Sequence, residues 1–342
     1  IIISRTMTHR ISLRPGDHHF AAADDQTVLE AALAAGLLLP HSCRDGACGA
    51  CKGKVLEGVV EQGRHSDGAL TEAERAEGYA LFCCARPLSD LVVQARNVTR
   101  ADDIPVKKLP SRVQKLQRLA DDVMLIDLKL PASENFQFRA GQYIDILLAD
   151  GRRRSFSIAN APHDGGHLEL HVRRIDGGRF TAHVFETMKD KEILRFEGPH
   201  GDFWLREDSA RPIVMVAGGT GFAPIKGIIE HAIHMGLTRS ITLYWGSRTR
   251  GGLYMDELAR SWEAALPGLR YVPVLSDEVW DGRQGLVHQA VLDDFADLSA
   301  HEVYVCGAPA MVDAARGSFC ASRGLPEEAF FADAFTFAQP TT

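Results

Sequence analysis

Three cysteines follow one another at short intervals in one glycine-containing loop, in the order Cys43, Cys48 and Cys51. A further cysteine pair, Cys83–Cys84, lies far downstream. For both groups to serve one site, the chain must return across the loop, so the first part of the sequence must form a compact unit around it. The chain has seven cysteines. An odd, clustered set does not fit the disulfide framework of a secreted protein, so we expect the reducing cytoplasm.

The spacing C-x4-C-x2-C with a distant fourth cysteine is typical of plant-type [2Fe–2S] ferredoxins. Two irons need four thiolates, so three come from a tight loop and one from across the fold. Gly46 and Gly49 would let the loop backbone approach the sulfur atoms. A structural zinc site and unliganded buried thiols are the alternatives, but zinc loops usually pair cysteines twice as C-x2–4-C. The adjacent Cys83 and Cys84 are poorly suited to such chelation, and spacing alone leaves open which of them binds iron.

The residue pattern divides the chain into three segments, and we expect domains over residues 7–98, 106–207 and 208–342. In the first segment, short alternating strands surround a helix expected over Thr27–Ala35, which ends at Gly36. Together with the cysteine loop, this pattern predicts a β-grasp ferredoxin domain.

The second and third segments differ in the periodicity of their apolar residues. Short alternating strands such as Val123–Lys129 and Leu168–Arg174 are separated by Gly, Pro and Asp, which is typical of a small antiparallel barrel. Further on, apolar runs without alternation, Ile213–Val216 and Val303–Cys306, are separated by helical stretches such as Pro224–Met235. Buried parallel strands between helices have this pattern. We expect an antiparallel β-barrel followed by a parallel α/β domain.

One expected barrel strand opens with Arg154-Ser155-Phe156-Ser157, which resembles the R-x-Y-S motif of the ferredoxin–NADP reductase superfamily with Phe in place of Tyr. The resemblance implies an FAD site. Arg154 would neutralise the flavin pyrophosphate, and the Phe156 ring would pack against the isoalloxazine face. The Ser157 hydroxyl would hydrogen-bond flavin N5, the hydride acceptor.

Further elements of the same superfamily follow in the same order. His171-Val172-Arg173 resembles a V-R element that contacts the flavin, and Gly198–Phe203 resembles a G-P-x-G-x-F turn. Gly177–Thr181, just before an expected helix, offers backbone N–H groups and a hydroxyl suited to a phosphate. The candidate cofactor-binding residues in these elements are His171, Val172, Arg173, Gly177, Gly178 and Thr181.

A glycine-rich loop, Gly218-Gly219-Thr220-Gly221, follows the expected strand Ile213–Val216 and leads into a helix. Glycines in this place allow close backbone approach, and the helix N-terminus can receive a pyrophosphate. The loop is not G-x-G-x-x-G; it resembles the G-G-T-G-x-x-P loop of the same superfamily. Cys306-Gly307-Ala308-Pro309 resembles the C-G-x-P motif, whose cysteine lies near nicotinamide C4. The resemblance implies that Ser157 and Cys306 act at the catalytic centre.

The residues after the next strands bear on the choice of nicotinamide cofactor. Arg248 could meet the adenosine half of either one. In the NADP-using branch of the superfamily, a Ser-Arg pair after the following strand holds the 2′-phosphate, whereas this chain has Ser276-Asp277. Because a carboxylate repels a phosphate, we expect NADH as the electron donor. Arg248 and Arg250 leave NADPH open.

Two further assignments rest on resemblance alone. The stretch Gly78–Cys83 resembles the G-Y-x-L-x-C ending of ferredoxin domains in reductases of this kind, which implies that Cys83 is the fourth iron ligand and Cys84 its neighbour. Phe335 resembles a terminal aromatic residue that shields the flavin in some relatives.

The domain order is similar to that of single-chain reductases of multicomponent oxygenases, from Met7 onward. Stretches such as Ala80–Leu91 and Phe138–Ser157 are most similar to bacterial CDP-6-deoxy-Δ3,4-glucoseen reductases, which supply electrons to a deoxysugar dehydratase. This resemblance implies an NAD(P)H-dependent electron-transfer reductase. Electrons would pass from NADH through FAD and the [2Fe–2S] cluster to a partner protein, which would be an oxygenase or a dehydratase component.

Charge and apolar content exclude other classes. The net charge of −7 argues against a nucleic-acid-binding surface. The longest apolar stretches, such as Leu29–Leu39, are too short to cross a bilayer, and no signal-peptide pattern opens the sequence. We therefore expect a cytoplasmic oxidoreductase without membrane insertion. A redox-sensing iron–sulfur flavoprotein without steady turnover remains the alternative, and reduction by NADH distinguishes the two.

Overall fold

The computed structural model describes residues 8–16, 18–41, 44–47, 49–95, 98–100 and 104–336. The chain forms two compact units. One contains the residues up to Pro105 and those from Asp333 onward, and the other contains Val106–Ala332. Each unit has its own hydrophobic core.

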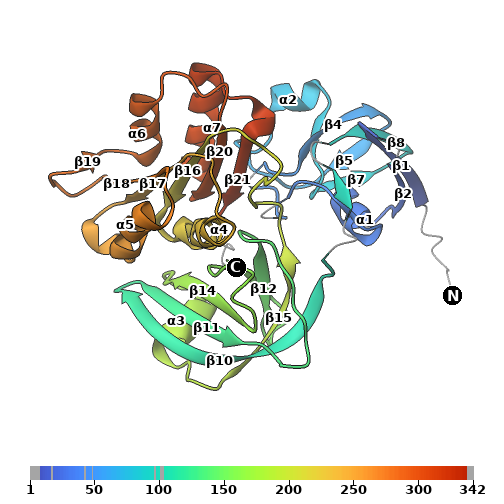
Figure 1. The fold of residues 1–342 in the computed structure, drawn as a ribbon. Helices are drawn as coiled ribbons and strands as arrows, with labels where there is room; N and C mark the ends of the chain where they lie inside the picture. Colours follow the sequence, from blue (N-terminus) through green and yellow to red (C-terminus); the bar gives the residue numbers. More distant parts are fainter. Residues whose placement is uncertain are drawn as a thin grey trace. The chain divides into compact units, whose positions relative to one another are not determined.

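The first unit contains a mixed five-stranded sheet in the order β2-β1-β8-β4-β6 (Figure 1). Strand β1 runs parallel to β8 and antiparallel to β2, and β4 is antiparallel to both β8 and β6. The strands are β1 (Thr8–Arg14), β2 (His18–Ala23), β4 (Lys52–Glu57), β6 (Tyr79–Leu81) and β8 (Leu91–Gln94). With helix α1 (Val28–Ala34), this sheet forms the predicted ferredoxin domain.

Helix α1 begins where the sequence supplies a complete cap. The Thr27 side chain accepts from the Glu30 backbone N–H, and the Glu30 carboxylate accepts from the Thr27 N–H. Its apolar face joins the core of the unit. A second capped helix, α2 (Glu72–Ala76), has no buried residue. Two short antiparallel pairs complete the unit, β3 (Leu37–Leu38) with β9 (Thr99–Arg100) and β5 (Val60–Gln62) with β7 (Ala85–Pro87).

The second unit begins with a six-stranded antiparallel sheet in the order β13-β12-β15-β10-β11-β14. Its strands are β10 (Lys107–Ala120), β11 (Val123–Lys129), β12 (Tyr143–Leu147), β13 (Arg153–Ser157), β14 (His167–Arg173) and β15 (Ile193–His200), and helix α3 spans Arg179–Glu186. An isolated antiparallel bridge joins Ile158, just after β13, to Leu170 in β14. The antiparallel sheet agrees with the predicted strand pattern, and its closure into a barrel stays a prediction.

The remainder of this unit carries a sheet in the order β19-β18-β17-β16-β20-β21 (Figure 1). The strands from β19 to β20 in this order are parallel neighbours. Helices α4 and α5 lie on one face of the sheet and α6 and α7 on the other. The strands are β16 (Ile213–Gly218), β17 (Ile241–Ser247), β18 (Leu269–Leu275), β19 (Arg283–Gln284), β20 (Glu302–Gly307) and β21 (Phe330–Ala334). The helices are α4 (Phe222–His234), α5 (Asp256–Ala265), α6 (Val287–Asp294) and α7 (Pro309–Arg323), with 3-10 turns at Gly219–Gly221, Arg250–Gly252 and Glu327–Ala329.

The residues of β16 and β20 are almost all buried and the centre of β17 is buried, which explains why their sequences are apolar without alternation. Because they are parallel, the loops that follow β16 and β20 meet at one edge of the sheet. Within the described residues, no helix is both long and apolar enough to cross a membrane.

Candidate cluster loop and flavin–nicotinamide site

Two predicted iron ligands, Cys51 and Cys83, lie in the described part of the first unit, whereas Cys43 and Cys48 lie outside the described residues. Cys51 directly precedes β4 and Cys83 comes two residues after β6, and these strands are neighbours. Both cysteines are buried, and the Phe82 N–H donates to the Cys51 carbonyl at 3.1 Å. The pairing of β4 with β6 therefore brings a loop cysteine and a downstream cysteine to matching strand ends.

The cluster loop requires glycine at two positions. Gly46 and Gly49 have φ angles of +79° and +73°, which other residues rarely adopt. A Cβ atom on Gly46 would lie 2.8 Å from the Arg64 carbonyl oxygen and 2.9 Å from Cys84 Sγ. Buried thiols beside a loop that leaves no room for a side chain fit a [2Fe–2S] cluster.

Cys84 lies directly beside the predicted fourth ligand. Its Sγ is 3.5 Å from Cys83 Sγ, and Cys84 is partly exposed whereas Cys83 is buried. The contact with Cys83, followed by burial, raises the pKa of the Cys84 thiol. Because both sulfurs are near the loop, the assignment of Cys83 as the ligand stays a prediction.

The predicted flavin motif lies on β13, at one end of the antiparallel sheet. Successive residues of a strand point to opposite faces, so Arg154 and Phe156 share one face. The Arg154 guanidinium is partly exposed and donates to the Arg153 carbonyl at 2.7 Å, and Phe156 packs on Phe180 with ring centroids 5.4 Å apart. Ser157 is buried at the end of the strand.

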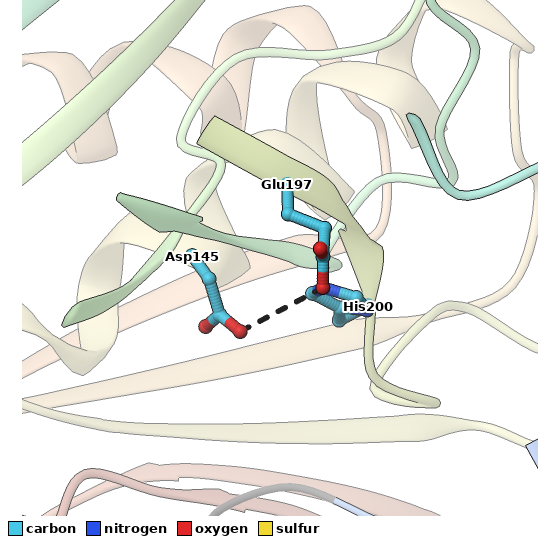
Figure 2. A group of neighbouring side chains, drawn as sticks. All are labelled: Asp145, Glu197 and His200. Atoms are coloured by element: carbon cyan, nitrogen blue, oxygen red, sulfur yellow. Dashed lines mark ion pairs between the residues drawn. The ribbon is translucent and has the colours of Figure 1, made fainter. Parts of the chain in front are cut away.

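The alternate residues of β13 contact a group of charged side chains from β12 and β15. Figure 2 shows Asp145, Glu197 and His200 facing one another, and His200 Nε2 lies 3.7 Å from a carboxylate oxygen of each. Arg153 forms ion pairs with both carboxylates, and the Ser155 hydroxyl donates to Asp145 at 2.7 Å.

The charges of this group are balanced by protein side chains. Lys108 pairs with Glu197 at 3.0 Å, and Arg153 bonds the same carboxylate. Burial alone would raise the pKa of Glu197, but hydrogen bonds from Arg153 and Lys108 lower it below its usual value. The group is therefore an ion-pair network that ties one face of β13 to the sheet, which leaves Arg154 and Phe156 on the opposite face.

The predicted phosphate-binding turn precedes α3. Gly177 has a φ of +72°, and Gly178 is the N-cap of the helix. The Thr181 hydroxyl accepts from the Ile175 N–H at 3.2 Å and lies 3.0 Å from the Gly178 carbonyl oxygen as a donor. Thr181 therefore closes the turn in this structure, and its contact with a phosphate stays a prediction.

Strand β14 carries the predicted V-R element, and its three side chains differ in their surroundings. Val172 is fully buried in the core. His171 is buried and bonds Glu169 and the Tyr254 hydroxyl, at 2.9 and 3.0 Å. Arg173 Nε lies 3.5 Å from an Asp122 carboxylate oxygen. Only Arg173 therefore offers a positive charge for a cofactor from this element.

The loop Gly218–Gly221 packs tightly against the end of β20. A Cβ atom on Gly221 would overlap the Cys306 carbonyl group, and one on Gly307 would lie 3.2 Å from the Gly218 nitrogen. The partly exposed Thr220 lies between these contacts along the loop. Cys306 is fully buried. The glycines are needed because two backbone segments meet here, and this contact brings the two predicted nicotinamide motifs together.

The same loop also reaches β14, which carries the predicted V-R element. A Cβ atom on Gly219 would lie 3.3 Å from the Arg173 guanidinium group. The Gly219 carbonyl accepts a hydrogen bond of 3.0 Å from the Trp245 indole N–H. Within the second unit, the nicotinamide loop and β14 are therefore direct neighbours.

The predicted adenosine-binding segments after β17 and β18 are joined by hydrogen bonds. The Asp277 N–H donates to the Arg248 carbonyl at 2.9 Å, and the Arg250 N–H donates to the Glu278 carboxylate at 2.7 Å. Both Arg248 and Asp277 are exposed. Two carboxylates, Asp277 and Glu278, thus lie where a 2′-phosphate would bind if the predicted orientation of the nicotinamide cofactor is correct.

Four residues of this site escaped sequence analysis: Glu169, Lys226, Trp245 and Tyr254. Lys226 is buried in α4 and bonds Glu169 at 3.1 Å. The signal in the sequence is a single lysine within the apolar first half of that helix. Phe335 follows β21 and belongs to the first unit, so its predicted contact with the flavin stays a prediction.

Three domain families match the chain in the predicted order. The 2Fe-2S iron-sulfur cluster binding domain matches residues 11–88, the oxidoreductase FAD-binding domain residues 110–204, and the oxidoreductase NAD-binding domain residues 215–317. These matches confirm the predicted cofactor set of FAD, a [2Fe–2S] cluster and a nicotinamide nucleotide.

Relatives match over nearly the whole chain. The CDP-6-deoxy-L-threo-D-glycero-4-hexulose-3-dehydrase reductase of Yersinia pestis is 40% identical, over 96% of this chain and 99% of the relative. Reductase component 2 of the terephthalate 1,2-dioxygenase of Comamonas sp. is 37% identical, over 96% and 98%. The crystal structure of the Amycolatopsis cytochrome P450 reductase GcoB has a TM-score of 0.79 at 35% identity, covering 97% of this chain and 100% of that one.

Fold, motifs and matches together define an iron–sulfur flavoprotein oxidoreductase that uses a nicotinamide nucleotide. The chain belongs to the family of single-chain reductases that includes the deoxyhexulose dehydrase reductases and the reductase components of oxygenases. The predicted electron path, from the nicotinamide through FAD and the cluster to a partner protein, is confirmed for this class.

Proposed function

We propose that NADH is the electron donor, and that the acceptor is a partner protein of the dehydrase or oxygenase type named for the relatives. The dehydrase reductases have the slightly higher identity, 40% against 37% for the dioxygenase component, so a deoxysugar dehydrase is the first candidate acceptor. The clustered thiols favour a reducing cytoplasm as the place of action. Domain limits at 7–98, 106–207 and 208–342 are part of the proposal.

The observation that carries the proposal is the contact of three predicted motifs within one compact unit. The Gly218–Gly221 loop touches the Cys306–Gly307 segment on one side and Arg173 of β14 on the other. Hydride transfer requires donor and acceptor atoms at near contact distance. The contact between the nicotinamide motifs and a flavin motif supports the proposal, because it would bring the two bound cofactors close together.

Each predicted residue has a defined task in this proposal. Arg154 would bind the flavin pyrophosphate, Phe156 would pack on the ring, and Ser157 would hydrogen-bond N5. The Gly218–Gly221 loop would hold the nicotinamide pyrophosphate, while Cys306 would orient the nicotinamide ring. Bound FAD exchanges a hydride for single electrons and the cluster carries them one at a time, so the protein supplies binding and orientation.

Rapid mixing of the anaerobic holoprotein with NADH tests the proposal. Flavin absorbance should bleach first and cluster absorbance should decrease afterwards, with NADPH reacting more slowly. Asp277→Ser should reduce the difference between the rates of flavin reduction by NADH and NADPH, because a negative charge is removed. Asp293→Ser, which also removes an exposed carboxylate, on α6, is the control. Equal rates with NADH and NADPH in the wild-type protein would overturn the donor assignment.

The acceptor is tested by adding purified dehydrase and oxygenase components to the NADH-reduced protein. Reoxidation of the cluster by either component, in repeated cycles, supports the proposal. If the cluster and flavin are reduced but neither component nor an artificial acceptor such as cytochrome c sustains turnover, the redox-sensing alternative is correct.

A further inference from the structure

A hydrogen-bonded chain of four side chains crosses the second unit from the helix after the nicotinamide loop to β14 and then back to the segment after β17. Lys226 of α4 bonds Glu169 at 3.1 Å, and Glu169 accepts from His171 Nε2 at 2.9 Å. His171 Nδ1 lies 3.0 Å from the Tyr254 hydroxyl. The side chains of Lys226 and His171 are almost completely buried. Because these buried polar groups are hydrogen-bonded to one another, they favour one relative position of α4, β14 and the segment after β17.

With a neutral His171 ring, the hydrogen-bond partners leave a single assignment of protons. Glu169 can only accept when ionised, so His171 Nε2 must carry the proton, and Nδ1 then accepts from the Tyr254 O–H. Lys226 forms an ion pair with Glu169 and donates to the Ala159 carbonyl at 3.2 Å and to Glu230 at 2.9 Å. Burial lowers the pKa of His171, in keeping with a neutral ring.

One end of the chain reaches the nicotinamide loop through aromatic rings. The Tyr254 ring meets Trp245 edge-on at 5.1 Å, and Trp245 stacks on Phe222 at 3.7 Å. The Trp245 indole N–H donates to the Gly219 carbonyl. The Tyr254 hydroxyl therefore connects β14 to a stack of rings that holds the loop itself.

The middle of the chain lies on β14. His171 is two residues from Arg173 on β14, and the Arg173 guanidinium group lies against Gly219. The loop is thus held from two directions, by Arg173 directly and by His171 through Tyr254 and Trp245. A shift of β14 relative to the loop would have to break the Tyr254–His171 hydrogen bond.

We propose that the Tyr254–His171 hydrogen bond sets the position of the nicotinamide loop relative to β14. Tyr254, His171 and Trp245 would then be positioning residues for hydride transfer. The inference rests on the proposed function. It assigns these residues no contact with the reacting atoms. Their effect is on the separation and alignment of the two cofactors, to which hydride transfer is highly sensitive.

Tyr254→Phe removes one hydroxyl and keeps the ring. Its matched control is Tyr271→Phe, which also removes a hydroxyl that bonds a side chain, here Asp256 at 2.9 Å. In rapid mixing with NADH, Tyr254→Phe should reduce the limiting rate of flavin reduction about tenfold relative to the control. The NADH dissociation constant should stay near the control value, because the loop glycines are intact. The isotope effect with NADH dideuterated at C4 should also change in Tyr254→Phe alone.

Amide hydrogen exchange provides a readout that does not depend on turnover. The Gly218–Gly221 segment should exchange faster in Tyr254→Phe than in Tyr271→Phe. If Tyr254→Phe does not fold, Trp245→Phe replaces it, since this change removes the N–H that holds the Gly219 carbonyl. Its control is Trp262→Phe, whose ring stacks on the same Phe222 at 5.6 Å.

The outcomes separate this inference from the proposed function. Equal reduction rates and equal exchange in the variants and their controls, with a wild-type protein that NADH reduces, would overturn the positioning role alone. A wild-type holoprotein that NADH does not reduce would overturn the proposed function first.

Discussion

At the scale of single residues, the main question at the cluster site is which of the adjacent thiols of Cys83 and Cys84 binds iron. Cys83 is buried and one residue from Phe82, whose N–H bonds Cys51. Cys84 is partly exposed, and its sulfur lies so close to Gly46 that a Cβ atom there would be 2.9 Å away. Burial and the link to Cys51 favour Cys83 as the iron ligand, although the two sulfurs are 3.5 Å apart.

We predict that Cys83→Ser loses the [2Fe–2S] cluster whereas Cys84→Ser keeps it. Serine is a poor substitute for a thiolate ligand but retains the size and hydrogen-bonding capacity that Cys84 needs beside Gly46. Iron content and the electron paramagnetic resonance signal of the dithionite-reduced protein measure the difference. A full signal in Cys83→Ser together with its loss in Cys84→Ser would reverse the assignment.

Sequence analysis could propose site residues but not the partners of their side chains. Cysteine spacing and glycine loops are local patterns, so they could be recognised directly. The partners of His171 and Thr181 could not be recognised in this way. His171 bonds Tyr254, which is remote in the chain, and Thr181 bonds the backbone of its own turn. Such partners depend on which face of a strand or helix is buried, and that is decided by tertiary packing.

At the scale of elements, the tight approach of the loop after β16 to the end of β20 has a measurable consequence. We predict that Gly221→Ala destabilises the second unit by about 1–3 kcal/mol, because the added methyl group would overlap the Cys306 carbonyl. Differential scanning calorimetry should show a lower unfolding temperature, and the NADH dissociation constant should increase.

The matched control is Gly317→Ala in α7. Nothing lies within 4 Å of a Cβ atom at Gly317, and alanine is the better helix former. This variant should unfold at a higher temperature and bind NADH as the wild type does. Similar unfolding temperatures for the two variants would show that the loop has room for a side chain.

Two strands of the antiparallel sheet run through residues that usually interrupt strands. Strand β15 contains Gly198-Pro199, the start of the stretch that resembles a G-P-x-G-x-F turn, yet it pairs with both β10 and β12. Strand β10 begins at Lys107, just inside the domain limit expected at residue 106, and continues through Pro110 to Ala120. Gly and Pro usually end strands, but here the neighbouring strands supply enough pairing to extend them. The apolar parallel strands were recognised because burial on both faces leaves a strong local pattern.

At the scale of the whole molecule, the cluster cysteines and the flavin–nicotinamide motifs belong to different compact units. We predict that Cys48→Ser loses the cluster but retains FAD and is reduced by NADH at the wild-type rate, because the hydride-transfer residues lie in the other unit. Rapid mixing with NADH, together with iron analysis, tests this. Loss of flavin reduction in a folded, FAD-containing variant would show that the units are not separable.

The position of β13 has a consequence for the protein before it acquires its flavin. This strand lies at one end of the sheet order, and among the described residues it pairs along its length only with β12. An unpaired strand edge is a template for aggregation. Arg152 is paired with Asp150 and Arg153 with Asp145 and Glu197, whereas the partly exposed Arg154 guanidinium donates to a backbone carbonyl. A second copy that approaches this edge would therefore meet the positive charge of Arg154. We therefore expect the arginine predicted to bind the pyrophosphate also to hinder edge-to-edge association of the apoprotein.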